Sequence, residues 1–326
     1  MDKIFTNVGV RSIASALPKN VLDLKTLGSI YSDEIVEKII ASTGISEVRI
    51  ADPDKTTADY CVAAAEELFS VDSVKPDDID GIILVTETPD RPIPHTSAII
   101  QAHLGLPNRT IAFDINYGCA GFVYGLFQAS MMIASGYCQT ILLCVGDTIT
   151  RHIDARDRAL RMVFGDAGAA IILSAVEKTQ PSAFCFHTEG DKFERLTMPT
   201  GGYISMDGIG VMNFVVQNVR RVIIETLKMS GLSTEAIELF AVHQANALIV
   251  DHLRQRLKVP QSKIPFGAGK VGNTVSSSIP LMLSTLYAGI NPSLERVLVC
   301  GFGTGLSCAA GVIDLSSTKI LSPLEI

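Results

Sequence analysis

Short apolar runs alternate with longer amphipathic stretches along the first half of the chain. Compact runs of aliphatic and β-branched residues predict buried strands, and apolar residues recurring every three or four positions predict helices. The predicted strands cover residues 3–15, 81–86, 110–114, 140–145 and 162–174, with the last interrupted at 165–168. The predicted helices cover residues 21–41, 57–69, 97–104 and 121–135. Alternation of this kind indicates an α/β architecture.

The second half of the chain repeats this order of elements. Helices are predicted over 213–229, 246–257 and 277–288, and strands over 239–242, 296–300 and 305–315. Residues 140–175 and 296–315 share the order strand, glycine-rich turn, strand, which indicates an internal duplication. We therefore expect two similar halves, 1–175 and 176–326. Because no low-complexity linker separates them, we expect both to pack as one body.

The composition and charge exclude several classes of partner. Apolar residues make up 47% of the chain and charged residues only 19%, which indicates extensive burial or an oligomer interface. The longest apolar run, 121–137, contains Gln128 and two serines and is too short to span a bilayer. The first residues lack an apolar signal core, so we expect a cytoplasmic protein. The net charge of −7 and the absence of a Lys/Arg block argue against nucleic acid as a partner.

The cysteines predict neither a disulfide framework nor a metal site. There are seven of them, and no C-x-x-C pair occurs. The histidines that could be considered as ligands, His95, His103, His187 and His252, have no partners at metal-ligand spacing. Most of the cysteines are expected to be small buried residues, and one is a candidate nucleophile.

Cys119 is that candidate because of its place in the predicted order. It lies between the strand 110–114 and the helix 121–135, which is apolar almost all round and therefore expected to be buried on every side. We expect Cys119 to lie on a turn between a central strand and a central helix. Backbone N–H groups and the helix dipole at such a turn favour thiolate over thiol.

Two further polar residues occupy matching positions in the second half. His243 follows the strand 239–242, and Asn273 opens a helix. A Cys, a His and an Asn can act together, since the His and the Asn can hold the same carbonyl oxygen. Each residue taken alone also has a simpler interpretation: a packed thiol, a structural imidazole and a helix cap.

Three other sequence patterns could indicate ligand-binding sites. The glycine-rich stretch 301–305 precedes a strand and not a helix, so it is not a dinucleotide loop, and 266–271 lacks the spacing of a phosphate loop. The arginines between 151 and 161 are interrupted by Asp154 and Asp157. They form either a solvated face or an entrance that meets phosphates.

The chain resembles the β-ketoacyl-acyl-carrier-protein synthase III family in five motifs that follow the family's order. These are YGCAGF (117–122), FGDAGA (164–169), HQAN (243–246), GNT (272–274) and GFGTGL (301–306). The resemblance covers nearly the whole chain. It implies an α/β thiolase-like fold with duplicated βαβαβ halves in a five-layered αβαβα arrangement, and a homodimer.

The resemblance also implies a reaction. Cys119 takes an acyl group from coenzyme A or an acyl carrier protein, with the backbone N–H groups of Cys119 and Thr304 as oxyanion hole. His243 and Asn273 then hold a malonyl or β-ketoacyl thioester for Claisen condensation. No cofactor is implied beyond coenzyme A or phosphopantetheine thioesters as substrates, and no metal.

Substrate-binding positions carried over by the resemblance are Arg151, Ile93, Asn246, Leu248 and Gly208. Several of these depart from the pattern of the family's fatty-acid-initiating members. Lys38 and Ser42 stand near the positions of a Trp and an Arg that grip adenine, and Leu248 replaces a carrier-docking Arg. Ile93 replaces a large aromatic at the tunnel floor and predicts room for a longer or branched chain.

These departures indicate a specialised-metabolism member that makes fatty-acid-like or polyketide products. Three alternatives stay open at this point. The first is an acyltransferase that passes the acyl group from Cys119 to an oxygen or nitrogen nucleophile. The second is a Cys-His-Asn hydrolase, and the third is a catalytically inactive partner subunit.

Overall fold

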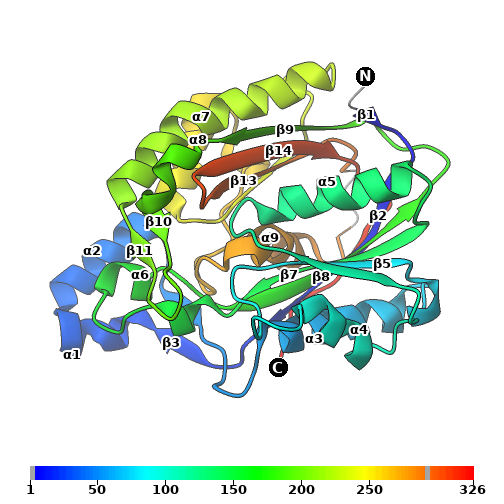
Figure 1. The fold of residues 1–326 in the computed structure, drawn as a ribbon. Helices are drawn as coiled ribbons and strands as arrows, with labels where there is room; N and C mark the ends of the chain where they lie inside the picture. Colours follow the sequence, from blue (N-terminus) through cyan, green and yellow to red (C-terminus); the bar gives the residue numbers. More distant parts are fainter. Residues whose placement is uncertain (1–3, 291–293) are drawn as a thin grey trace.

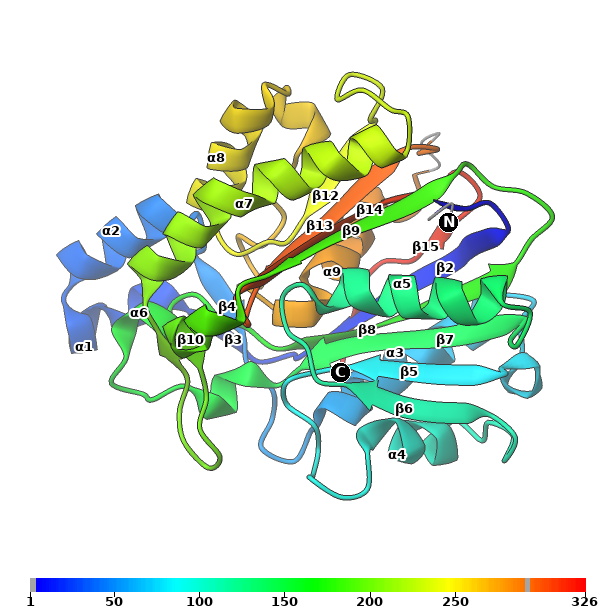
Figure 2. The same ribbon diagram turned by 45° about the horizontal axis from the view of Figure 1, so that its top comes forward.

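The computed structural model describes residues 4–290 and 294–326. The helices and sheets form five stacked layers (Figure 1). Helices α3 and α4 cover one face of a seven-stranded sheet, and α7 and α8 cover the outer face of a five-stranded sheet (Figures 1 and 2). Helices α5 and α9 lie between the sheets. This is the five-layered αβαβα arrangement expected from the sequence.

The elements have the following bounds. The helices are α1 (Gly28–Tyr31), α2 (Asp33–Thr43), α3 (Thr57–Val71), α4 (Thr96–His103), α5 (Gly121–Ala134), α6 (Arg158–Arg161), α7 (Gly208–Met229), α8 (Ala247–Leu257) and α9 (Ser278–Tyr287). The strands of the larger sheet, in spatial order, are β15 (Lys319–Ile320), β2 (Val8–Leu17), β8 (Ala167–Ala175), β7 (Thr140–Asp147), β5 (Gly81–Val85) and β6 (Ile111–Ile115), and β16 (Leu324–Glu325) also pairs with β2. The smaller sheet has the order β1 (Ile4–Phe5), β9 (Ser182–Thr188), β14 (Ser307–Ile313), β13 (Val297–Gly303) and β12 (Leu239–Val242). Two short hairpins pair β3 (Val21–Asp23) with β4 (Glu47–Arg49) and β10 (Leu196–Thr197) with β11 (Ser205–Met206).

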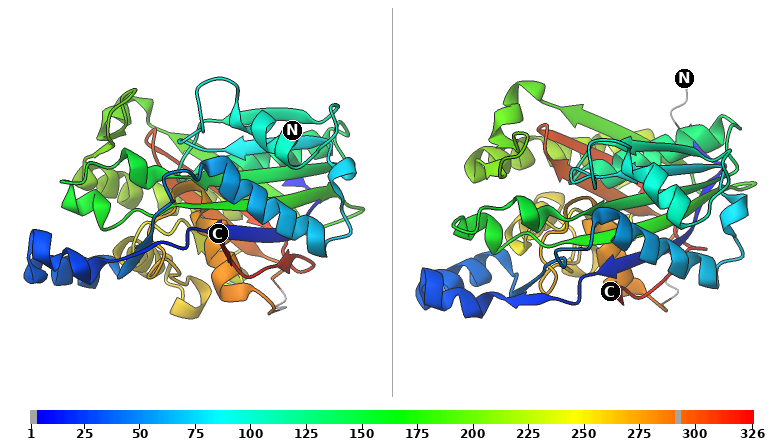
Figure 3. Two further views of the ribbon diagram at one scale, coloured as in Figure 1. Left: turned by 90° about the horizontal axis from the view of Figure 1, so that it is seen from below. Right: turned by 60° about the horizontal axis from the view of Figure 1, so that its bottom comes forward.

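The two sheets repeat one topology, which explains the repeated order in the sequence. In the larger sheet β5 is parallel to β7, and β7 is antiparallel to β8. In the smaller sheet β12 is parallel to β13, and β13 is antiparallel to β14. Each end of the chain pairs with the other half, because β1 pairs with β9 while β15 and β16, in red in Figure 3, pair with β2, in blue. The division between residues 175 and 176 stays a prediction.

Helix α5 is apolar all round because both sheets pack on it. Phe122, Val123 and Leu126 belong to one core cluster with Ile171 of the larger sheet and Val299 of the smaller sheet. The central position predicted for this helix is confirmed, but burial on every side is not, because Met131 is 46% exposed. The described residues include no helix long and apolar enough to cross a membrane.

Several sequence-based predictions are wrong, for tertiary reasons. The helix predicted over 21–41 begins instead as strand β3, and Ser32, with a φ of 76°, separates α1 from α2. The strand predicted over 162–174 begins only at Ala167, and the predicted final strand is followed by β15 and β16. Strand β9 is not predicted at all. The strand predicted over 3–15 has its first residue outside the described residues.

The strand that leads to Cys119 is also not central. In the described sheet β6 pairs only with β5 and forms the edge, where all five of its residues are partly exposed (Figure 2). An antiparallel or parallel neighbour could therefore still pair along its free side.

Candidate active site

Cys119 lies where the edge strand meets the central helix. The chain leaves β6 at Ile115, and Gly121 begins α5 with Ala120 as its N-cap residue. The Gly121 N–H donates to the Gly118 carbonyl over 2.7 Å and closes the turn. The Cys119 side chain is only 7% exposed. The strand-to-helix position predicted for this thiol is correct, although the strand is an edge strand.

The glycine-rich motif at 301–305 brings the second sheet against this thiol. A Cβ added at Gly301 would lie 2.5 Å from the Cys119 carbonyl oxygen, and one added at Gly303 would lie 2.7 Å from the Cys119 Cβ. Both glycines are in β13, which is held between β12 and β14. Only glycine permits so close an approach of the two backbones.

Gly303→Ala is therefore expected to cost both stability and thiol reactivity. Neither β13 nor the turn at Cys119 can move freely, so the added methyl should cost about 1–3 kcal/mol in unfolding free energy. Chemical denaturation and the alkylation rate of Cys119 measure the two effects. The control is Gly190→Ala, where an added Cβ meets nothing within 4 Å. Equal behaviour of the two variants would contradict the close approach.

His243 is held at the end of β12 by contacts from both sides. Its backbone N–H donates to the Cys300 carbonyl over 2.8 Å, and the ring of Phe302 lies edge-on at 5.2 Å between centroids. Its Nδ1 lies 2.6 Å from the Ser278 Oγ, which accepts from the Gln244 N–H. Nδ1 is the one acceptor among the described contacts of the Ser278 hydroxyl, so we assign the hydroxyl as donor to Nδ1 and the ring proton to Nε2.

Asn273 is fixed by pairing with the FGDAGA motif. Its N–H donates to the Val163 carbonyl over 2.8 Å, and its carbonyl accepts from the Gly165 N–H over 3.0 Å. The side-chain oxygen accepts from the Val275 N–H over 3.0 Å, so the side-chain NH₂ is the group that remains to donate to a ligand. Val275 has a φ of 51°, an uncommon conformation for a β-branched residue that marks a strained turn at the site.

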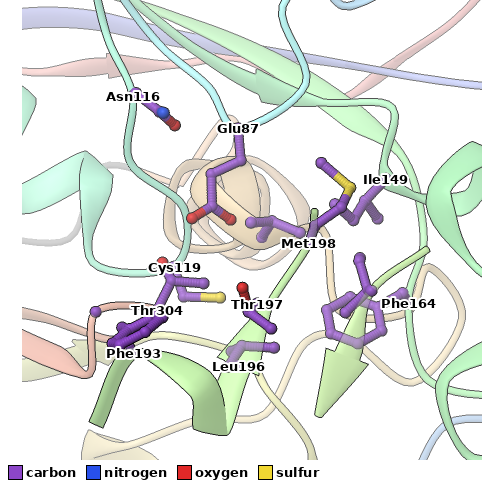
Figure 4. Close-up of a pocket in the computed structure, with 13 residues that line it drawn as sticks. Glu87, Asn116, Cys119, Ile149, Phe164, Phe193, Leu196, Thr197, Met198 and Thr304 are labelled. Carbon is purple, nitrogen blue, oxygen red and sulfur yellow. The ribbon is translucent and has the colours of Figure 1, made fainter. Parts of the chain in front are cut away.

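Two cavities meet at Cys119. The first, here called the Glu87 cavity, has a volume of about 280 Å³ and includes Thr304 in its lining (Figure 4). The second, here called the His243 cavity, has a volume of about 200 Å³ and is lined by Cys119, His243 and Asn273 together. The structure therefore brings together the three residues that the sequence suggested could act as a unit.

The predicted binding residues fall into two groups. Asn246, Leu248 and Gly208 also line the His243 cavity. Asn246 accepts from the Ile249 N–H as the N-cap of α8, and Leu248 is 58% exposed at the surface end of the cavity. Their position suits the phosphopantetheine arm of a thioester substrate.

Arg151 and Ile93 do not line either cavity. The Arg151 guanidinium donates to the backbone carbonyls of Asp52 and Lys55, and the Ile93 side chain is 85% exposed. Within one chain Ile93 therefore does not form a tunnel floor.

The two positions suggested near adenine also line neither cavity. Lys38 pairs with Glu34 at the surface, and the Ser42 hydroxyl donates to the Ile39 carbonyl.

Two carboxyl groups near the thiol, a buried one and a partly buried one, were missed at the sequence level. Glu87 lines the cavity with Cys119, and Asp147 at the end of β7 accepts from the Ser276 hydroxyl over 2.5 Å and from the Glu87 N–H over 2.8 Å. A signal was present, because each carboxyl directly follows or ends an apolar strand. Strand ends are where open α/β sheets collect reactive groups.

The charge state of Cys119 corrects an expectation. Burial, followed by the negative charges of Glu87 and Asp147, raises the pKa of the Cys119 thiol well above its usual value. Burial and the two nearby carboxyl groups therefore outweigh the helix dipole, which favours the thiolate. Burial also raises the pKa of Asp147 to about 7 and lowers that of His243 to about 3. His243 is a neutral hydrogen-bond donor.

The low pKa of His243 predicts a specific pH dependence. In the folded protein the ring stays neutral above a pKa of about 3, whereas an ordinary histidine protonates near 6.5. Decarboxylation of a malonyl thioester should therefore show no inflection from His243 between about pH 5 and 8. An inflection near 6.5 that persists in Asp147→Asn, which removes the nearby carboxyl whose pKa is about 7, would contradict this. Acylation of Cys119 should rise with pH over the same range.

The same shift has a consequence for stability. Below pH 6.5 the unfolded chain takes up a proton that folded His243 does not, so this residue lowers the free energy of unfolding as the pH falls toward 3. Carbon dioxide release and thermal unfolding, each measured against pH, test the two effects.

Comparison with known proteins identifies the family. The family model 3-oxoacyl-[acyl-carrier-protein (ACP)] synthase III matches residues 113–191, and the model for its C-terminal part matches 227–315. Beta-ketoacyl-[acyl-carrier-protein] synthase III of Caldanaerobacter subterraneus subsp. tengcongensis is 34% identical over 94% of this chain and 98% of its own length.

Solved structures agree with this assignment. A 3-oxoacyl-(acyl-carrier protein) synthase from Burkholderia xenovorans LB400 superposes with a TM-score of 0.96 at 28% identity, covering 99% of this chain and 98% of that one. The priming β-ketosynthase from the R1128 polyketide biosynthetic pathway gives 0.87 at 30% identity, covering 95% and 97%. The thiolase-like fold and the condensing activity expected from the sequence are thereby confirmed. The chain belongs to the β-ketoacyl-[acyl-carrier-protein] synthase III family of acyl-transferring condensing enzymes.

Proposed function

We propose that Cys119, His243 and Asn273 carry the two half-reactions of this family in this chain. The observation that supports this is their convergence on one cavity, where a thiol, a neutral imidazole and a side-chain amide meet. Cys119 takes an acyl group from a coenzyme A or acyl-carrier-protein thioester. The acyl group then condenses with a malonyl or β-ketoacyl thioester held by His243 and Asn273.

In the first half-reaction the Cys119 sulfur attacks the thioester carbonyl. The backbone N–H groups of Cys119 and Thr304 are the proposed donors to the oxyanion. Thr304 is steadied because its carbonyl accepts from the Ser307 hydroxyl over 2.7 Å. The thiol proton leaves as the S–C bond forms and ends on the departing sulfur, which suits a thiol whose pKa burial keeps high.

In the second half-reaction an enolate forms as carbon dioxide leaves a malonyl unit. His243 Nε2–H and the Asn273 NH₂ both donate to the thioester oxygen on which the negative charge develops. Two neutral donors placed beforehand typically contribute about 3 kcal/mol each, or on the order of 10²–10³ in rate. The enolate carbon then attacks the Cys119 thioester, forms the new carbon–carbon bond and releases Cys119 as a thiolate, which takes up a proton from solvent to restore the thiol.

Intact-protein mass spectrometry combined with product analysis tests this function. An acyl-CoA or acyl-carrier donor should add the mass of its acyl group to the chain, and a malonyl thioester should then release carbon dioxide and a ketone. Formation of an ester or amide would instead indicate transfer to oxygen or nitrogen. Rapid loss of the acyl group to water would indicate a hydrolase, and no added mass with any donor would indicate an inactive subunit.

Substrate identity also belongs to this proposal. Lys38 and Ser42 lack the groups with which fatty-acid-initiating relatives are expected to grip adenine, and Arg151 is engaged with backbone carbonyls. We therefore favour a specialised pathway over acetyl-CoA priming, with acyl-CoA or an acyl carrier protein as donor. No bound cofactor or metal is invoked, and a cytoplasmic location stays a prediction from the sequence.

A homodimer is the proposed assembly, paired along β6. This strand has a free edge in the described chain, and Asp114 on it accepts from the N–H groups of Thr96 and Ser97 that follow the Ile93 loop. A second copy at this edge would cover Ile93 and bring it near the partner's cavity. Light scattering should give twice the chain mass of 34.9 kDa, and a single-chain mass at micromolar concentration would overturn the assembly.

A further inference from the structure

Glu87 stands out because nothing in the condensation described above uses it. It follows β5 and lines the cavity that contains Cys119 and Thr304 but neither His243 nor Asn273 (Figure 4). If His243 and Asn273 hold the second thioester, the acyl chain carried by Cys119 must occupy the opposite cavity. The Glu87 carboxyl therefore lies where the acyl chain has to lie.

The surroundings of this carboxyl are mainly apolar. It is the only Asp, Glu, Lys or Arg among the described residues that line the cavity, and seven of the others are Ile149, Phe164, Phe193, Leu196, Met198, Ile204 and Val275. Burial raises the pKa of Glu87, and the nearby Thr304 hydroxyl lowers it only in part. A carboxyl in such a place costs free energy unless a bound molecule supplies a further hydrogen bond.

Hydrogen bonds hold the backbone at Glu87, and the lack of a side chain at Gly118 leaves space for its carboxyl. Its N–H donates to Asp147 over 2.8 Å, and the neighbouring Thr88 hydroxyl donates to the same oxygen over 3.3 Å. A Cβ added at Gly118 would lie 2.2 Å from the Glu87 Oε2, so the carboxyl packs directly on the backbone next to Cys119. The carboxyl is therefore positioned beside the thioester end of an acyl chain, and not at its far end.

We propose that Glu87 determines which acyl group the enzyme accepts, by hydrogen bonding to a hydroxyl or amine near the thioester carbonyl of the chain on Cys119. The inference rests on the proposed function, because it requires an acyl group on Cys119. The cavity volume of about 280 Å³ suits a short chain. The substrate class is thus a short acyl thioester with a hydrogen-bond donor on its second or third carbon.

The position of Glu87 narrows the range of acyl chains expected from the sequence. Ile93 predicts room for a longer or branched chain, and it does not line the cavity of its own chain. The wall that faces the acyl group near the sulfur carries a carboxyl. Polarity near the thioester is therefore expected to select among acyl groups of similar length.

Competition between matched acyl donors tests the proposal. The wild-type protein is offered 3-hydroxybutyryl-CoA with 3-methylbutyryl-CoA, then 2-hydroxybutyryl-CoA with 2-methylbutyryl-CoA, then 3-aminobutyryl-CoA with 3-methylbutyryl-CoA. Intact mass gives the ratio of the two adducts in each pair. In at least one pair the polar chain should be favoured roughly 10- to 100-fold, as expected for a hydrogen bond to a carboxyl. Preference for the methyl isostere in all three pairs overturns the proposal.

Variants of Glu87 separate selection from other roles. Glu87→Leu should reverse the ratio while apolar donors still acylate Cys119, and Glu87→Gln, which keeps the size and one acceptor oxygen, should give an intermediate ratio. The exposed Glu66→Gln is the matched control and should keep the wild-type ratio. An equal fall with all donors in both Glu87 variants would overturn the proposal and assign Glu87 to support of Thr304 or to proton transfer. Absence of any adduct on wild-type Cys119 would instead overturn the proposed function itself.

Discussion

Cys119→Ala is expected to abolish covalent acylation and, with it, formation of any condensed product. The substitution removes the sulfur proposed to form the thioester, and enzymes that lose their nucleophile typically fall by about 10⁶ in rate. Because the side chain is 7% exposed and flanked by Gly303, alanine should be accepted without rearrangement. The variant is therefore expected to fold normally and to show no mass increment with any donor.

Another buried cysteine provides the control for this prediction. Cys138 is 1% exposed and lines neither cavity, so Cys138→Ala should keep the full acyl increment. An increment that persists in Cys119→Ala, or that vanishes in Cys138→Ala, would move the nucleophile elsewhere. Peptide mapping of the acylated wild-type chain gives the position directly.

The second large effect is expected at His243, and it should divide the two half-reactions. His243→Ala removes one of two donors to the enolate oxygen, so condensation and carbon dioxide release should fall on the order of 10²–10³. Acylation should persist, because the proposed oxyanion hole uses the backbone of Cys119 and Thr304. A mass increment with little carbon dioxide is therefore the expected signature.

The electrostatics of His243 make this division a sharp test. Burial lowers the pKa of the ring to about 3, so it is a poor base for the Cys119 proton at neutral pH. Equal loss of acylation and condensation in His243→Ala would contradict that assignment and give the imidazole a role at the thiol. The exposed His103→Ala serves as control and should leave both steps unchanged.

The sequence was most informative for the elements that are largely buried. The strand predicted over 239–242 has exactly the bounds of β12, and the helix predicted over 121–135 differs from α5 by one residue. Continuous apolar runs record burial locally, so they survive without knowledge of the neighbours. The same pattern was misleading over 21–41, where pairing of β3 with β4 outweighs a local preference for helix.

The candidate catalytic residues were also predicted from the ends of apolar runs, and this prediction was incomplete for a similar reason. Cys119, His243 and Asn273 were each suggested by their place at the end of a strand or the start of a helix, and the structure brings all three to one cavity. Glu87 also follows an apolar strand, but no nearby residue in the sequence indicated that it belongs to a site. Its significance depends on Gly118 and Thr304, which the fold alone places beside it.

By itself the sequence determined most of the buried elements, the duplicated α/β plan and the candidate residues for thioester and enolate chemistry. Only the tertiary structure decided the environment of those residues: β6 at a free edge, a thiol whose pKa is raised, a neutral imidazole and a carboxyl in the Glu87 cavity. The physical reason is that apolar periodicity reports whether a residue is buried, whereas a pKa depends on which charges and dipoles lie nearby. Those neighbours come from segments far apart in the chain.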